Sequence, residues 1–269
     1  MPLAADRRVK ILERVAEGMS IQVGDLAREF ACSEMTIRRD IARLERDGFV
    51  RRTYGGATAH LTRSLEVAVN ARSLANAPQK RLIALTAVGL MRDVHVLYVG
   101  IGTTAEHFAR YLPARSDLTI VTGSLPIASL LGTRSGKAVV LGGNVRRDEL
   151  SCVGPMARAT LERYRFDLAV LGTAGLTARW GLTDLNDDEA EIHRVVIERS
   201  ERLMVVADGS KLGVVTNAVV AGASVIQTLV TDSGALESEV AELRGLGIEV
   251  VIAKPGARRR VEEDEAMEA

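Results

Sequence analysis

The chain has 269 residues, of which 47% are apolar, and its 35 basic side chains balance its 35 acidic ones. This length allows one sizeable core and a small additional domain, while the neutral net charge gives by itself no sign of nucleic-acid binding. No run of about 18 uncharged apolar residues occurs, and the first residues lack the apolar stretch of a signal peptide. We therefore expect neither a membrane-spanning nor a secreted protein, but a soluble, cytoplasmic one.

The two cysteines, Cys32 and Cys152, lie far apart in the sequence. They form no Cys-x-x-Cys pair and have no histidine cluster nearby, which argues against a disulfide framework and against a zinc site. We expect both to be small buried residues, and we expect no cofactor.

Three short helices are predicted in the first fifty residues. Apolar residues recur at spacings of three and four over residues 6–19, the period of an amphipathic helix, and again over residues 23–30. After a tight connection, Ser33 is a suitable N-cap for a third helix. The second and third helices then form a helix-turn-helix.

The third helix divides into an apolar and a polar face. Ile37, Ile41 and Leu44 form the narrow stripe that packs on the other two helices. The residues away from this stripe are Met35, Thr36, Arg38, Arg39, Arg43 and Arg46. In a helix-turn-helix the second helix enters the major groove of DNA, and its N-terminal residues contact the bases. Thr36, Arg38 and Arg39 are therefore placed to reach DNA.

A wing is predicted after the third helix. Residues 49–57 alternate apolar and basic side chains and end in two glycines, as a short hairpin does. Arg51 and Arg52 would lie along the DNA backbone. An ordinary basic helix on a helical bundle is the alternative, but three helices, a capped third helix and a basic wing together favour a winged helix-turn-helix.

The segment 36–50, followed by residues 52–57, resembles the DNA-binding signature of DeoR-type bacterial regulators. The resemblance implies that Ser33, Thr36, Arg38 and Arg39 belong to the recognition helix. It also implies that Gly55 and Gly56 end the wing. The DNA-binding residues that we expect are Ser33, Thr36, Arg38, Arg39, Arg43, Arg51 and Arg52.

The rest of the chain predicts an α/β domain with a mainly parallel sheet, because short apolar runs alternate with helical patterns. The runs that we interpret as strands are 94–99, 118–121, 138–141, 168–171, 203–207, 228–230 and 248–252. The expected domains are a winged helix-turn-helix at 1–60, a linker at 61–77, an effector-sensing α/β domain at 78–253 and a charged, disordered tail at 254–269.

Several predicted strands run into turns rich in glycine and hydroxyl groups. The Gly102-Thr103-Thr104 turn opens a helix, so its backbone N–H groups and the helix dipole suit an anion such as phosphate. Lys211 could add positive charge. These residue types together suit a phosphorylated sugar, although each of them also has an ordinary structural explanation. The effector-binding residues that we expect are Gly102, Thr103, Thr104, Ser124, Gly143, Arg146, Glu189 and Lys211.

The DeoR-type resemblance extends over residues 75–232, where it implies a sensor domain related in fold to ribose-phosphate isomerases and CoA transferases, with phosphorylated sugars or their breakdown products as effectors. Two positions depart from the family pattern. Gly100 stands where an aspartate is common, and Gly123 where an asparagine is common. Losing these side chains could enlarge the pocket or change the hydroxyl pattern that it accepts.

Two alternatives remain open for the second domain. The first is a sugar-phosphate isomerase, with Asp187, Asp188 or Glu189 as base and Lys211 as electrostatic partner. Because a DNA-binding region is fused to this domain, we expect the domain to bind its ligand without converting it, and we expect the chain not to be an enzyme. The second is a dinucleotide sensor, since residues 100–105 formally fit G-x-G-x-x-G/A, but no acidic residue ends the next strand.

The expected mechanism is that of a transcriptional regulator, and the resemblance favours a repressor of carbohydrate genes. Its partners would be an operator in double-stranded DNA, a small-molecule effector and further copies of the same chain. Paired winged-helix domains would bind repeated or inverted half-sites, and the effector would shift their arrangement.

Overall fold

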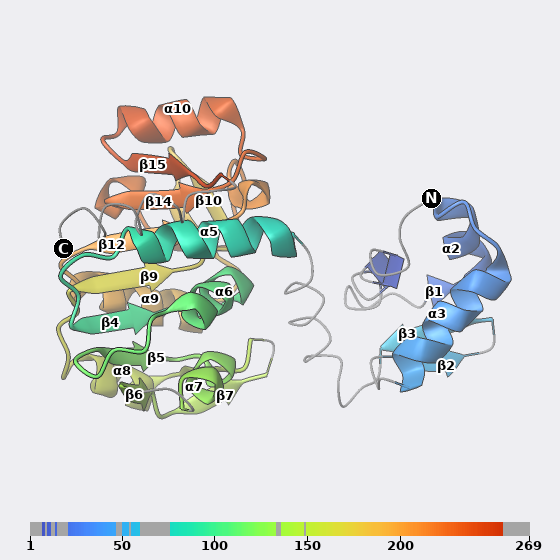
Figure 1. Ribbon diagram of the computed structural model, residues 1–269, viewed down its shortest axis with the longest axis horizontal. Coiled ribbons are helices and arrows are strands. Elements are labelled where there is room, and N and C mark those ends of the chain that lie inside the picture. The colour runs from blue at the N-terminus through green and yellow to red at the C-terminus, as the bar shows by residue number, and fades with distance from the viewer. Residues whose placement is uncertain are drawn as a thin grey trace, which may run out of the picture. The chain divides into compact units, whose positions relative to one another are not determined.

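The computed structural model describes residues 7, 8, 10, 11, 14, 21–46, 50–53, 55–59, 76–132, 136–147 and 149–254. The chain divides into two compact units, Met1–Asn76 and Ala77–Ala269 (Figure 1). Nearly all of the predicted linker, and the predicted tail beyond Lys254, lie outside the described residues. The boundaries at residues 60, 77 and 253 therefore stay predictions.

The first unit contains the predicted helix-turn-helix and wing. Its elements are β1 (Ile21–Gln22), α2 (Val23–Glu29), α3 (Glu34–Arg46), β2 (Val50–Thr53) and β3 (Gly56–Ala59). The strands form one antiparallel sheet in the order β1-β3-β2. Of the first predicted helix, residues 7, 8, 10, 11 and 14 are described, and all five are helical.

The core of the first unit fixes the orientation of α3. Ile37, Ile41 and Leu44 are at most 3% exposed and pack with Phe30 of the preceding turn and Ile11 of the first helix. Burying each such side chain contributes roughly 1.5–3 kcal/mol. The predicted apolar stripe is confirmed, so the opposite face of α3 is turned to solvent.

The second unit is built on a seven-stranded parallel sheet in the order β15-β14-β12-β9-β4-β5-β6. Its strands are β4 (Val96–Val99), β5 (Thr119–Thr122), β6 (Lys137–Val140), β9 (Leu168–Leu171), β12 (Leu203–Val206), β14 (Thr228–Thr231) and β15 (Glu249–Ile252). All seven predicted strands are present and belong to this sheet. The α/β fold class is confirmed.

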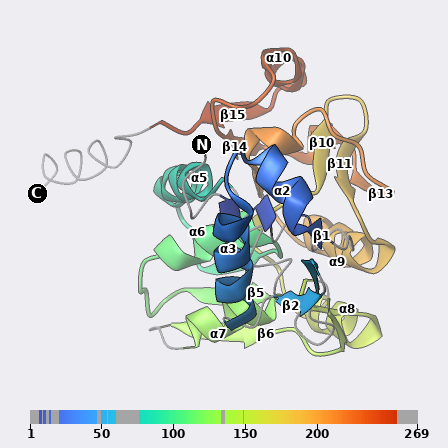
Figure 2. The same cartoon turned by 90° about the vertical axis from the view of Figure 1, so that its right-hand side faces the viewer.

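Helices cover both faces of the large sheet (Figure 2). On one face lie α5 (Ala77–Gly89), α6 (Thr103–Tyr111) and α7 (Leu125–Leu131), and on the other α8 (Pro155–Leu161), α9 (Asp187–Glu198) and α10 (Glu237–Gly245). Successive strand residues alternate between the two cores: Leu97 and Val99 belong to the first, and Tyr98 to the second.

Two small sheets of the second unit were not predicted. One is the hairpin of β7 (Asn144–Arg146) and β8 (Ser151–Val153), and the other contains β10 (Gly175–Thr177), β11 (Gly181–Asp184) and β13 (Ala218–Ala221). The short helical turns η1 (Gly209–Lys211) and η2 (Ala223–Val225) complete the unit. Most of these short strands mix polar and apolar residues, so they lack the apolar run that predicted the strands of the large sheet.

Burial departs from the sequence pattern at one strand and from the expectation at one cysteine. The edge strand β6 is largely exposed, with Val140 at 45%, because it pairs only with β5. Cys152 is buried, but Cys32 is only half-buried, because it lies in the connection between α2 and α3. Within the described residues no helix has both the length and the apolar character needed to span a bilayer.

Candidate functional site

The start of the helix α3 is fixed by Ser33. Its Oγ accepts a 3.2 Å hydrogen bond from the backbone N–H of Thr36 and lies 2.9 Å from the Thr36 hydroxyl. The predicted N-cap is confirmed. Both hydroxyls are thereby engaged with each other at the N-terminal end of α3, which is the end that contacts bases in helix-turn-helix proteins.

The arginines of α3 fall into two groups. Arg38 donates a 2.8 Å hydrogen bond from Nη2 to Glu34 Oε2. Glu45 lies on the same side of the helix as Arg38, and its Oε2 is 4.0 Å from Arg52 Nε. Arg39 and Arg43 are exposed and take part in no ion pair found within the described part of the chain. Only the charge of Arg38 is therefore partly neutralised by a neighbouring carboxylate.

The two basic residues of the wing, Arg51 and Arg52, lie in β2, an edge strand of the sheet β1-β3-β2. Arg52 is exposed, and its backbone N–H donates a 3.2 Å hydrogen bond to Glu45 Oε1, which ties β2 to the end of α3. Arg51 lies in β2, opposite Thr58 of β3, but its side chain is outside the described residues. Its assignment to DNA stays a prediction.

The predicted anion cradle lies at the carboxyl end of β4. Gly102 has φ +95° and is the N-cap of α6, and Thr103 and Thr104 form its first turn and are buried. No side chain caps this helix. In contrast, Ser124 caps α7 and Asn186 caps α9. The first-turn amides of α6 therefore have no side-chain cap, as is also the case in α8 and α10.

The carboxyl end of β5 is joined to the hairpin β7–β8. Ser124 forms an isolated bridge with Ser151, and the Cys152 backbone N–H donates a 2.7 Å hydrogen bond to the Gly123 carbonyl. The Ser124 hydroxyl accepts a 3.3 Å hydrogen bond from the Ile127 backbone N–H. Ser124 thus positions the hairpin and caps α7, and this structural role is present whether or not it binds an effector.

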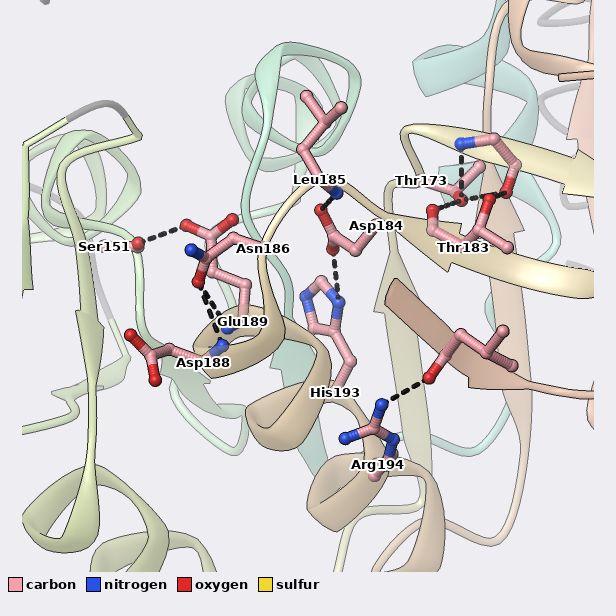
Figure 3. Close-up of polar contacts among 12 residues, drawn as sticks. Ser151, Thr173, Thr183, Asp184, Leu185, Asn186, Asp188, Glu189, His193 and Arg194 are labelled. Atoms are coloured by element: carbon pink, nitrogen blue, oxygen red, sulfur yellow. Dashed lines mark hydrogen bonds and ion pairs between the residues drawn. The ribbon is translucent and has the colours of Figure 1, made fainter. Parts of the chain in front are cut away.

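Glu189 lies at the centre of a cluster that joins the hairpin to α9. Ser151 donates a 2.6 Å hydrogen bond from Oγ to Glu189 Oε1 (Figure 3), and Arg146 Nη1 lies 2.7 Å from Glu189 Oε2. We call Ser151, Glu189 and Arg146 the Glu189 cluster. The glutamate is 3% exposed, whereas its neighbours Asp187 and Asp188 are exposed. Of the three acidic residues considered, only Glu189 is directed inward.

Burial raises the pKa of the Glu189 carboxyl. The Ser151 hydroxyl and the Arg146 guanidinium act in the opposite direction, while the charges of Asp184 and Glu149 add to the rise. A carboxyl with a raised pKa keeps its proton to a higher pH than an exposed glutamate does.

A second buried polar pair lies one helical turn further along α9. His193 Nδ1 is 3.2 Å from Asp184 Oδ2, and the Leu185 backbone N–H donates a 2.7 Å hydrogen bond to Asp184 Oδ1 (Figure 3). Glu189 and His193 are four residues apart, so they lie on the same face of α9. The carboxylate of Asp184 thus adds negative charge near Glu189 and holds the imidazole in place.

The other two predicted effector residues are placed differently. Gly143 has φ +122°, and a Cβ there would lie 2.5 Å from the Val153 carbonyl oxygen, so this glycine is required by the hairpin packing. Lys211 lies in η1, at the carboxyl end of β12, and is half-buried. Asp208 caps this turn by accepting from the Ser210 backbone N–H at 3.1 Å.

The two glycines that depart from the family pattern, Gly100 and Gly123, differ in their surroundings. A Cβ at Gly100 would lie 2.9 Å from Leu171 Cδ2. A Cβ at Gly123 would lie 3.4 Å from Leu141 Cδ1 and 3.5 Å from the Tyr98 hydroxyl. A side chain at Gly100 would therefore require Leu171 to shift, whereas one at Gly123 would meet ordinary van der Waals contacts, and the effect of the two glycines on an effector pocket stays a prediction.

Three residues of this region were missed: Ser151, Asp184 and His193. Ser151 gave no signal, because the hairpin that contains it was not predicted. The spacing of four between Glu189 and His193 was visible, and it would have placed both on one helix face. Asp184 lies in β11, whose pairing with β13 joins segments far apart in the sequence.

Two matches to known families cover most of the chain. Residues 7–62 match the DeoR-like helix-turn-helix domain, and residues 75–233 match the DeoR C terminal sensor domain. A chain with this pair of domains is a DNA-binding transcriptional regulator with a sensor domain. It belongs to the DeoR family.

Relatives in the same family are similar over nearly their whole length. The HTH-type transcriptional regulator GlpR of Haloferax volcanii is 33% identical over 250 residues, which cover 93% of this chain and 98% of that protein. The transcriptional repressor AccR of Agrobacterium fabrum is 31% identical over 231 residues, which cover 85% of this chain and 90% of that protein.

Similarity to solved structures is more distant. Ribose 5-phosphate isomerase A of Methanocaldococcus jannaschii is 22% identical, with a TM-score of 0.39 over 51% of this chain and 55% of that chain. The assignment to the DeoR family therefore rests on the domain matches and the relatives.

Proposed function

We propose that the chain is a cytoplasmic repressor of carbohydrate-metabolism genes, which binds its operator through α3 and the wing and releases it when a phosphorylated sugar or related metabolite binds to the second unit. The single observation that carries the effector class is the buried Glu189 cluster, in a unit whose helix α6 begins without a side-chain cap. The relative named as the repressor AccR supports the sign of regulation.

The proposed phosphate position is the N-terminus of α6. Its uncapped backbone amides, with the hydroxyls of Thr103 and Thr104, offer donors to an anion, and the helix dipole favours negative charge there. Lys211 follows β12 and is the cation that we assign to the same phosphate. All these residues follow parallel strands and so share one edge of the sheet.

The proposed position for the sugar hydroxyls is the Glu189 cluster. Glu189 contacts Ser151 and Arg146 in the described part of the chain, and a carboxylate can accept about four hydrogen bonds, so it can also accept one from a ligand hydroxyl. A buried carboxyl paired in this way rejects ligands that lack a matching hydroxyl, because its hydrogen-bonding groups would be left unpaired. The cluster thus accounts for selectivity, and the α6 N-terminus for charge.

DNA binding is proposed to use a homo-oligomer. A single winged helix-turn-helix is small, and two linked copies on repeated or inverted half-sites gain affinity by raising the effective concentration of the second copy. An effector that favours the arrangement unable to bind DNA must then weaken operator binding.

A thermal-shift screen tests the effector class. The full chain would be melted with D-ribose 5-phosphate, D-fructose 6-phosphate and glycerol 3-phosphate, and with inorganic phosphate and the unphosphorylated compounds as controls. A true effector at about 100 times its Kd stabilises the fold by about 2.7 kcal/mol. A screen extended to further sugar phosphates in which none exceeds inorganic phosphate would contradict the proposal.

The same samples address the isomerase alternative. If the second unit only binds, product analysis after long incubation will recover each sugar phosphate unchanged. Steady conversion that is lost in Glu189→Gln would show an enzyme with Glu189 as its base.

A further inference from the structure

Met35 is an apolar side chain left in solvent on the DNA-binding unit. It is 55% exposed, although it belongs to α3, a helix whose other large apolar residues are buried. Among the described residues of the first unit, no other large apolar side chain is so exposed. Neither the core of this unit nor the ion pairs of α3 therefore account for a methionine here.

The position of Met35 on α3 is well defined. The hydrogen bond from the Thr36 N–H to the Ser33 hydroxyl fixes the first turn, and Met35 lies within that turn. At about 100° per residue, it lies about 160° away from Ile37 of the core stripe and one turn before Arg39. Met35 and the exposed Arg39 therefore share the outward face of the recognition helix, with Met35 at the end that contacts bases.

The chemistry of the major groove restricts what a methionine can contact there. Three of the four bases present only hydrogen-bonding groups at their groove edges, and only thymine adds a methyl group. A thioether placed against a polar edge removes water without replacing its hydrogen bonds, whereas against a methyl group it buries apolar surface on both sides. The favourable partner of Met35 is therefore a thymine.

We propose that Met35 is a specificity residue that contacts the C5-methyl group of one thymine in each operator half-site, with Arg39 of the same helix face anchoring the neighbouring base or phosphate. This inference rests on the proposed operator binding by α3. The proposed function states only that α3 binds DNA, and this inference adds which base one of its side chains recognises.

The test begins with an operator selected by the full chain from a library of random DNA duplexes. Each thymine of the selected site is then replaced in turn by deoxyuridine, which removes only the methyl group. For the unmodified chain, we expect one thymine per half-site whose replacement weakens binding about 3- to 10-fold. For Met35→Ala, we expect weaker binding to the thymine site and less than a 2-fold effect of the same replacement.

Met156→Ala is the matched control, because Met156 is 68% exposed but lies on α8 of the second unit. It should bind the selected operator, and respond to deoxyuridine, as the unmodified chain does. If no replacement matters, or if the sensitive thymine is equally sensitive in Met35→Ala, the assignment of Met35 is overturned while operator binding stands. If no duplex is enriched at all, operator binding itself fails, and this inference fails with it.

Discussion

Ser151 and Glu189 are joined by a 2.6 Å hydrogen bond, although 38 residues separate them in the chain. The bond connects the hairpin β7–β8 to the first turn of α9, and Arg146 of the same hairpin pairs with the other carboxylate oxygen. The hairpin and α9 are therefore held together by one buried carboxyl. A ligand that competes for this carboxyl acts on both elements at once.

The pH dependence of stability should report on Glu189. Burial raises its pKa in the folded chain, so the folded state holds the proton more tightly than the unfolded state does. Its contribution to stability is fully present below the unfolded pKa and is lost as the pH rises through the folded pKa. Glu189→Gln cannot titrate, so its urea-unfolding free energy should fall less than that of the unmodified chain as the pH rises from about 4 to about 8.

Glu198→Gln is the control for this measurement, since Glu198 is an exposed residue of the same helix. It should keep the pH profile of the unmodified chain. Identical profiles for Glu189→Gln and the unmodified chain would show that the buried carboxyl is not a source of pH dependence.

Operator binding should depend on Arg39 more than on an arginine elsewhere. Arg39→Ala removes an exposed cation without an ion-pair partner in the described part of the chain, and it should cost about 1–3 kcal/mol of binding if the contact is to a base. Arg158→Ala removes the same charge from α8 and should bind normally. Fluorescence anisotropy with a labelled operator measures both. Equal affinities for the two variants would remove Arg39 from the interface.

The effector response should be separable from DNA binding. Thr104→Ala and Lys211→Ala each remove a proposed phosphate contact, so we expect their operator affinity without effector to be unchanged. The effector concentration that releases half of the operator should rise by about 5-fold or more. The control Lys137→Ala alters an exposed lysine of the edge strand β6. A variant with the same half-release concentration as that control would exclude its residue from the effector site.

Gly143 should be needed for folding rather than for ligand binding alone. Gly143→Ala places a Cβ 2.5 Å from the Val153 carbonyl oxygen at φ +122°, so it should destabilise the chain by about 1–3 kcal/mol. In Gly245→Ala the new Cβ meets nothing within 4 Å, so the free energy of unfolding should stay the same or rise by about 1 kcal/mol. Urea unfolding of both variants compares them. Equal stabilities would show that the hairpin tolerates a side chain at Gly143.

The parallel sheet and the recognition helix could be predicted because their residues carry repeating patterns. The central strands β9 and β12 are continuous apolar runs, and the stripe of Ile37, Ile41 and Leu44 has the period of a helix. The N-cap at Ser33 is equally local, because the Ser33 hydroxyl accepts a hydrogen bond from the backbone N–H of Thr36, only three residues later.

The Glu189 cluster could not be predicted as a cluster, because its contacts join segments that are distant in the sequence. Ser151 meets Glu189 only through a hairpin whose strands have three residues each. The close approach of Leu171 to Gly100 could not be predicted for the same reason. It depends on the pairing of β4 with β9, two strands that neighbour each other in the sheet but are not consecutive in the chain.

The most direct test of sugar-phosphate-controlled operator binding is a linkage measurement. The full chain is titrated with its selected operator, with and without a saturating amount of the sugar phosphate that stabilises it most in the thermal-shift screen. We predict that the ligand weakens operator affinity by about 5-fold or more, and that the operator weakens ligand affinity by the same factor. A ligand that stabilises the chain but leaves operator affinity unchanged would contradict this prediction.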